Sequence, residues 1–233
     1  MKAALALASA LAVLGGQEDG APAKKRVLIL GDSISIGYTP FVKEMMKDVA
    51  VVVRPTAAGG KDENCEGTTK GAKEIARWTA LEGGRWDVIH FNFGLHDLKR
   101  VDAKTGKNSN EPQDPRQAEP EAYEKNLREI VAALKKTGAK LVFATTTPVP
   151  EGRLSPRRDP EDPPRYNAIA RKVMEENGVA VNDLHAFALP RLKEIQRPQN
   201  VHFNEEGSKL LAGEVVRHVR QALGLPAAEE PKR

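Results

Sequence analysis

The chain has 233 residues, of which 40% are hydrophobic and 29% charged, so it can bury the core of one ordinary domain. This composition excludes a globally disordered chain, and no apolar run reaches the ~18 to 20 residues that a membrane-spanning helix needs. The single cysteine, Cys65, excludes an internal disulfide framework and a four-cysteine zinc site. The net charge of +4 is a small excess, and acidic residues occur along the whole length, so we expect no nucleic-acid partner.

The N-terminus has the pattern of a secretory signal peptide. Lys2 precedes an unbroken apolar stretch over residues 3–14, and the small residues Ala21-Pro22-Ala23 follow after a short polar patch. We therefore expect a signal peptide over residues 1–23, one domain over 24–225, a flexible tail over 226–233, and export to the periplasm or the medium. Because no cysteine follows the apolar stretch we expect no lipid anchor, and because the stretch is short we expect no membrane insertion. A buried N-terminal helix is the alternative.

Strands and helices alternate along the rest of the chain. Five short apolar runs predict strands, and five amphipathic stretches between and after them predict helices. The strands are expected over 26–30, 50–54, 87–93, 139–145 and 178–182, and the helices over 38–48, 67–81, 120–137, 164–177 and 205–223. This alternation predicts βαβ units and a parallel sheet covered on both faces.

Two long loops follow predicted strands. They span residues 98–119 and 147–163, and the second contains Arg153, Arg157 and Arg158. In an open parallel sheet, ligands bind outside the carboxyl ends of the strands, so these loops are expected to border a binding site.

Three short motifs carry residue types suited to nucleophilic catalysis. Gly31-Asp32-Ser33 follows the first strand, where a serine hydroxyl is exposed at the N-terminus of a helix. His202 precedes the last helix, from where it could act as general base on Ser33. The third motif, Gly94-Leu95-His96-Asp97, follows the third strand and places a hydrogen-bond donor beside the first.

Taken in chain order, Gly31–Ser33, Gly94–Asp97 and then His202, the three motifs resemble those of the SGNH, or GDSL, hydrolase family, over roughly residues 26–222. The resemblance implies a flavodoxin-like three-layer α/β/α sandwich with a five-stranded parallel sheet. It also implies ester hydrolysis through an acyl-serine, without a metal or other cofactor. The residues that it implies are Ser33 and His202 for catalysis, Ser33, Gly67 and His96 for the oxyanion hole, and Asp32, Gly94, Asp97 and Gln199 in support.

Three positions depart from the family's pattern. His96 stands where the family has asparagine, and an imidazole N–H can donate the same hydrogen bond. Gln199 stands where the family has the aspartate that orients the catalytic histidine; Asp183 or a backbone carbonyl could replace it, and His185 is a weaker alternative for the base itself. A further block of the family, the second in chain order, resembles Asn64-Cys65-Glu66-Gly67-Thr68-Thr69, with its glycine displaced by one residue.

Because of that displacement, more than one residue of this block could donate its backbone N–H to the oxyanion. Gly67 is the first candidate for the backbone N–H, Glu66 is the alternative, and Gly59-Gly60 is a poorer match. The predicted function is that of an exported serine esterase that deacetylates a carbohydrate or another small ester, with acidic sugars favoured by the arginines at 153–158. A lipid acyl-ester hydrolase and a non-catalytic carbohydrate-binding protein on the same scaffold are the alternatives.

Overall fold

The structure is a computed structural model that describes residues 23–227. All but the last residue of the expected signal peptide and all but two residues of the expected tail lie outside this range. Within it, no helix combines the length and apolar character needed to cross a membrane.

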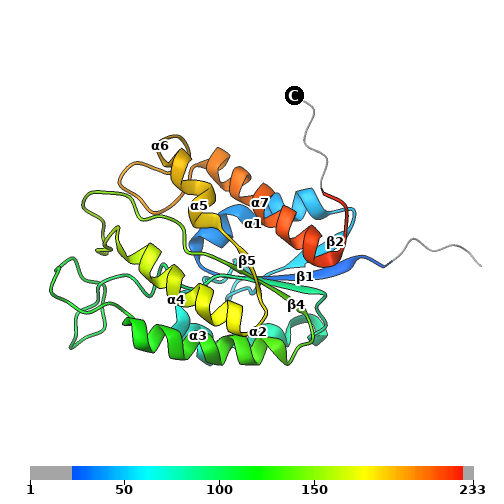
Figure 1. Cartoon of the computed structure of the whole chain (residues 1–233), viewed down its shortest axis with the longest axis horizontal. Helices are drawn as coiled ribbons and strands as arrows, with labels where there is room; N and C mark the ends of the chain where they lie inside the picture. Colours follow the sequence, from blue (N-terminus) through cyan, green and yellow to red (C-terminus); the bar gives the residue numbers. More distant parts are fainter. Residues whose placement is uncertain (1–22, 228–233) are drawn as a thin grey trace, which may run out of the picture.

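Five parallel strands form one sheet in the order β2-β1-β3-β4-β5 (Figure 1). The strands are β1 (Lys25–Leu30), β2 (Ala50–Val53), β3 (Val88–Phe91), β4 (Lys140–Ala144) and β5 (Ala180–Asn182). Most apolar residues of the inner strands β1, β3 and β4 are buried because both faces of the sheet are covered, whereas the edge strand β2 leaves Val51 exposed. The predicted flavodoxin-like architecture is confirmed, with β1 and β3 adjacent near the middle of the sheet.

Two groups of helices cover the faces of the sheet (Figure 1). One layer pairs α1 with α7, and the other packs α2 against α3 and α3 against α4. These helices are α1 (Ser33–Met46), α2 (Thr68–Thr79), α3 (Pro120–Lys135), α4 (Asp162–Glu176) and α7 (Glu205–Leu223). Short helices α5 (Leu184–Ala188) and α6 (Leu192–Ile195), with 3-10 turns η1 (Leu81–Gly83) and η2 (Leu189–Arg191), complete the chain.

The first helix starts five residues earlier than the sequence pattern predicts, at Ser33 rather than at residue 38. The cause is local: Asp32 is the N-cap, and its Oδ1 accepts a hydrogen bond of 2.9 Å from the backbone N–H of Ile34. This cap places Ser33 in the first turn of α1, directly beyond the carboxyl end of β1. The last helix spans the predicted residues, with Asn204 as its N-cap.

Two long loops, β3–α3 and β4–α4, are joined to each other at the carboxyl edge of the sheet. The backbone N–H of Arg100 donates to the carbonyl of Arg157 at 2.9 Å. Arg100 also pairs with Asp159, and Arg116 donates to both carboxylate oxygens of Asp162 at 2.6 and 2.8 Å. Because the ion pairs run from one loop to the other, or to the start of α4, the loops form one connected wall beside the active-site edge.

Candidate active site

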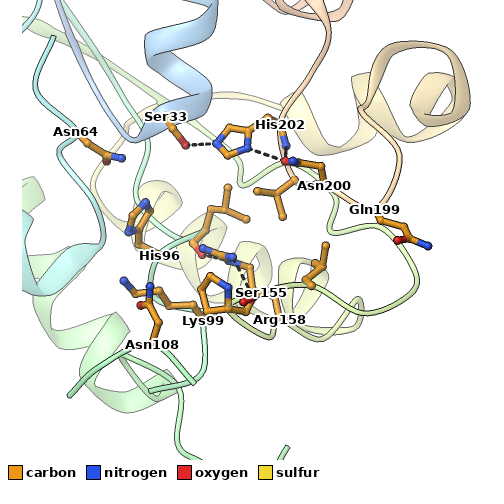
Figure 2. Close-up of a pocket in the computed structure, with 14 residues that line it drawn as sticks. Ser33, Asn64, His96, Lys99, Asn108, Ser155, Arg158, Gln199, Asn200 and His202 are labelled. Carbon is orange, nitrogen blue, oxygen red and sulfur yellow. Dashed lines mark hydrogen bonds between the residues drawn. The ribbon is translucent and has the colours of Figure 1, made fainter. Parts of the chain in front are cut away.

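Ser33 and His202 meet at the carboxyl end of β1. The Ser33 Oγ lies 2.8 Å from the His202 Nε2 (Figure 2), although the two residues are 169 positions apart. The cap at Asp32 fixes Ser33 at the start of α1, and the turn before α7 presents His202 to it. The fold therefore brings together the two residues that the sequence nominated for nucleophile and base.

The residue that orients His202 is Asn200 rather than Gln199. The His202 Nδ1 lies 2.7 Å from the Asn200 Oδ1, which also accepts the backbone N–H of His202 at 2.9 Å. Gln199 adopts the left-handed conformation, with φ of 50°, and Figure 2 shows its side chain pointing away from His202. The expectation that Gln199 supports the histidine is therefore not met, because the backbone turns that side chain outward.

The contact with Asn200 fixes the tautomer of the imidazole. A carbonyl oxygen can only accept, so Nδ1 carries the proton and Nε2 offers its lone pair to the Ser33 hydroxyl. Burial lowers the pKa of His202, and the nearby guanidinium groups of Arg197 and Arg158 lower it further. The imidazole is thus held in the neutral form that can accept a proton.

The other acid and base considered from the sequence lie elsewhere. Asp183 accepts a hydrogen bond of 2.9 Å from the Thr145 hydroxyl and pairs with Arg171. His185 lines a separate hollow together with Asp183 and Arg171. Neither residue contacts the Ser33–His202 pair, so neither takes the role that the sequence left open for it.

His96 borders the same cavity as Ser33 and His202. Burial, followed by the charges of Lys99 and Arg158, lowers the pKa of His96 to about 3, so this imidazole is neutral. The Nδ1 atom of His96 is buried and has no hydrogen-bond partner among the described residues. The Nε2 atom is not buried in this way. A neutral ring that carries its proton on Nε2 would present one donor to the cavity.

The segment from Asn64 to Gly67 contributes an unexpected side chain. Asn64 lines the cavity, whereas Gly67 and Glu66 do not. The Glu66 backbone N–H is already donated to the Asn64 Oδ1 at 2.9 Å, which leaves the amide nitrogen of Asn64 free to face the other way. Figure 2 shows that nitrogen directed toward the side of the cavity where Ser33 and His96 lie. The structure thus adds the side chain of Asn64, three positions before Gly67, as a candidate donor, while a backbone donor at Gly67 stays a prediction.

Gly67 also lies where the segment from Asn64 to Gly67 meets the Gly94–Asp97 motif. It is the N-cap of α2 and offers no capping side chain, and the buried carboxylate of Asp97 takes that role. Asp97 accepts hydrogen bonds from the Thr68 backbone N–H at 2.9 and 3.0 Å and from the Thr68 hydroxyl at 2.6 Å. A Cβ at Gly67 would lie 2.8 Å from that carboxylate, so only glycine leaves it room. Burial raises the pKa of Asp97 to about 7.

Gly94 and Asp32 support the site through packing and capping. A Cβ at Gly94 would lie 1.9 Å from the Thr146 Oγ1, which explains the small residue where β3 and β4 end side by side. Burial raises the pKa of Asp32 above its ordinary value, against the opposing pull of Arg158 and Arg54. Asp32 follows β1 and Gly94 follows β3, so each shapes the segment that positions a residue of the site, Ser33 and His96 respectively.

The cavity has a volume of about 310 Å³. His96 and Lys99 come from the β3–α3 loop, and Ser155 and Arg158 come from the β4–α4 loop, so both long loops contribute walls as expected. Over residues 23–227, the structure holds no cluster of three His, Cys, Asp or Glu side chains arranged to bind a metal ion.

The sequence profile of the GDSL-like Lipase/Acylhydrolase family matches residues 29–210. This chain belongs to that family. The GDSL-like family is one of esterases and acylhydrolases, so this enzyme is a carboxylic ester hydrolase by family. The match contains Ser33, His96 and His202.

Solved structures share the GDSL-like fold at low sequence identity. An acetyl xylan esterase, AlAXEase, superposes with a TM-score of 0.62 at 18% identity, covering 83% of this chain and 99% of its own. A lipase/acylhydrolase from Enterococcus faecalis gives 0.65 at 19% identity, covering 88% and 100%. A variant of the acetyl-xylooligosaccharide esterase Axe2 from Geobacillus gives 0.62 at 16%, covering 89% and 97%. No curated protein matched in the sequence search.

Proposed function

We propose that this enzyme hydrolyses small carboxylic esters through an acyl-serine intermediate on Ser33. The observation that carries the proposal is the relay from Ser33 Oγ to His202 Nε2 at 2.8 Å and from His202 Nδ1 to Asn200 Oδ1 at 2.7 Å. An activated serine nucleophile requires this spatial order of groups: a hydroxyl, a neutral imidazole and a fixed hydrogen-bond acceptor.

The reaction follows from the positions of these groups. His202 accepts the Ser33 proton at Nε2 as Oγ attacks the ester carbonyl, and the carbonyl oxygen becomes an oxyanion. Collapse of this intermediate breaks the bond to the alcohol, which leaves with the proton returned by His202. Water, deprotonated by His202, then attacks the acyl-serine, and the second tetrahedral intermediate releases the carboxylic acid and regenerates Ser33.

Three donors surround the position of the oxyanion in this proposal. The backbone N–H of Ser33 lies in the first turn of α1, where N–H groups have no partner within the helix. The Nε2–H of His96 and the amide nitrogen of Asn64 complete the set. The dipole of α1 also favours negative charge at this end of the helix.

Acetylated carbohydrates are the substrate class that we favour. The neighbours named as an acetyl xylan esterase and an acetyl-xylooligosaccharide esterase support this choice, as does the small cavity with many polar walls. The same walls argue against a long-chain lipid substrate. The non-catalytic reading depended on Gln199, and Asn200 at hydrogen-bonding distance from His202 weakens it. Export remains a proposal that the N-terminal sequence supports.

The first experiment measures acetate release from p-nitrophenyl acetate and from acetylated xylan. The wild type is compared with Ser33→Ala and with Ser208→Ala, a control on the partly exposed side of α7. We expect activity that disappears in Ser33→Ala and persists in Ser208→Ala, with both variants folded by circular dichroism. Turnover that survives in Ser33→Ala would show that another residue is the nucleophile.

A further inference from the structure

We propose that the substrate carries an anionic group, such as a carboxylate, close to its scissile ester, and that Lys99 and Arg158 bind this group. This inference deepens the proposed function and rests on it, since it concerns what the Ser33 cavity selects. Figure 2 places both cationic side chains on the side of the cavity opposite Ser33 and His202.

Arg158 is a buried cation with no carboxylate partner in the described chain. Arg158 is only 8% exposed. The Nε donates to the Leu95 carbonyl at 2.7 Å and one terminal nitrogen donates to the Pro156 carbonyl at 3.4 Å. Within residues 23–227 no acidic oxygen forms an ion pair with it, and its second terminal nitrogen has no hydrogen-bond partner. The nearest opposing charge is the buried carboxylate of Asp32, which acts on the Arg158 guanidinium from beyond ion-pair distance. Burying an unpaired charge is costly, so an arginine retained here indicates a counter-ion supplied by a ligand.

Lys99 adds a second cation to the same cavity. It is partly buried, and among the described residues it forms neither an ion pair nor a side-chain hydrogen bond. Burial lowers the pKa of Lys99, and the charge of Arg158 acts in the same direction against the opposing charges of Glu66 and Asp97. None of the residues of the described chain that line this cavity is acidic.

The other arginines of the loops differ from Arg158. Arg157 pairs with Asp159 at 2.9 Å, and Arg116 pairs with Asp162 at 2.6 Å. Arg153 lines a separate hollow of about 330 Å³ that also contains Glu111. The expectation from sequence that the arginines at 153–158 favour acidic substrates thus narrows to Arg158, with Lys99 as a partner that the sequence did not indicate.

The expected preference for an anionic substrate follows from the usual strength of a charged hydrogen bond. A guanidinium or ammonium that binds a carboxylate in a partly desolvated cavity favours the anionic substrate over a neutral analogue by about 10- to 100-fold in kcat/KM. Because binding to a fixed charge acts on substrate and transition state alike, most of the preference should be in KM.

The test compares matched esters that differ in one charge. On the acyl side the pair is monoethyl succinate, which carries a carboxylate, and ethyl butyrate, which is neutral. On the alcohol side the pair is the acetylated methyl glycoside of glucuronic acid, with its carboxylate free, and the acetylated methyl glycoside of glucose. Each pair is measured with the wild type, Lys99→Gln, Arg158→Lys and the control Lys104→Gln. Lys104 is exposed on the same loop and outside the cavity. Arg158→Lys keeps the charge but loses the fork of donors, and thermal melting verifies that it folds.

We expect one pair to show the preference, which identifies the half of the ester that carries the anion. We also expect Lys99→Gln to reduce the preference by about tenfold, mainly through a higher KM for the anionic ester, and Arg158→Lys to weaken the preference. The control Lys104→Gln should keep both the preference and the turnover of neutral esters. Ser33-dependent hydrolysis of neutral esters with no preference in either pair would overturn the anion site alone, as would a preference that Lys99→Gln leaves intact. Turnover independent of Ser33 would instead overturn the proposed function.

Discussion

Replacing Asn200 by aspartate should raise the pKa of His202 and strengthen it as a base. The Asn200 Oδ1 already accepts hydrogen bonds from the His202 Nδ1 at 2.7 Å and from its backbone N–H at 2.9 Å. An aspartate oxygen can accept both, so the substitution adds a charge while the geometry is kept. The wild-type histidine lacks this charge, and its pKa is lowered from the ordinary 6.5 by burial and by two arginines.

The expected size of the change follows from Coulomb's law. Charge centres about 4 Å apart at an effective dielectric constant of about 20 attract by about 4 kcal/mol. Desolvation of the new carboxylate and its partial exposure to water reduce the net effect, so we expect the acid limb of the kcat/KM profile to move up by about 1 to 2 pH units. Above both pKa values the variant should be about tenfold faster, because the carboxylate stabilises the imidazolium that forms during the reaction.

The assay is the pH profile of kcat/KM with p-nitrophenyl acetate between pH 4 and 9, with blanks for spontaneous hydrolysis. The wild-type acid limb should have its midpoint below pH 6.5, since His202 must be neutral to act. Gln199→Asp is the matched control: it adds the same charge one residue away, on a side chain that points outward. We expect it to move the limb by less than about half a pH unit. An unmoved limb in Asn200→Asp, or a larger shift in Gln199→Asp, would refute the assignment of Asn200.

Three further substitutions test the frame around the reacting groups. His96→Ala should lower kcat by about 10²- to 10³-fold, with His96→Asn within about tenfold of wild type, because either amide or imidazole can donate to the oxyanion; equal rates in all three proteins would remove His96 from this role. Asp97→Ala should lower the free energy of unfolding by about 2 to 3 kcal/mol in denaturant titrations, since the buried donors of Thr68 lose their acceptor. Gly94→Ala should cost about 1 to 3 kcal/mol through its clash with Thr146, and an unchanged denaturation midpoint would contradict this packing.

The sequence predicted the sheet and its helices because their signals are local. Apolar runs of five to seven residues and helical periodicity depend on neighbours along the chain, so both ends of all five predicted strands lie within two residues of the observed ends. The start of α1 was misplaced because the cap at Asp32 outweighs the weaker apolar pattern of the first turn. Ser33, His96 and His202 could be nominated from motifs that resemble a known family.

The missed residues depend on backbone turns and on contacts between loops. Asn200 reaches His202 because an asparagine side chain readily bonds the backbone two residues on, a signal present in the sequence but common to many loops. The left-handed conformation of Gln199 that turns its side chain outward could not be read from its identity. Lys99 and Arg158 face one cavity only because two loops, distant in sequence, are joined by hydrogen bonds such as that from Arg100 to Arg157.

The carboxylate of Asp97 couples the residues at the start of α2 to the His96 motif, so that a change in one requires a change in the other. It bonds Thr68, 29 positions earlier, and it occupies the space that a side chain at Gly67 would need. A larger residue at Gly67 is therefore compatible only with a smaller one at position 97, and a helix that gains its own N-cap no longer depends on the distant carboxylate. Among relatives, these two positions should change together, and transfer of the His96 motif into another scaffold should succeed only when the start of α2 is transferred with it.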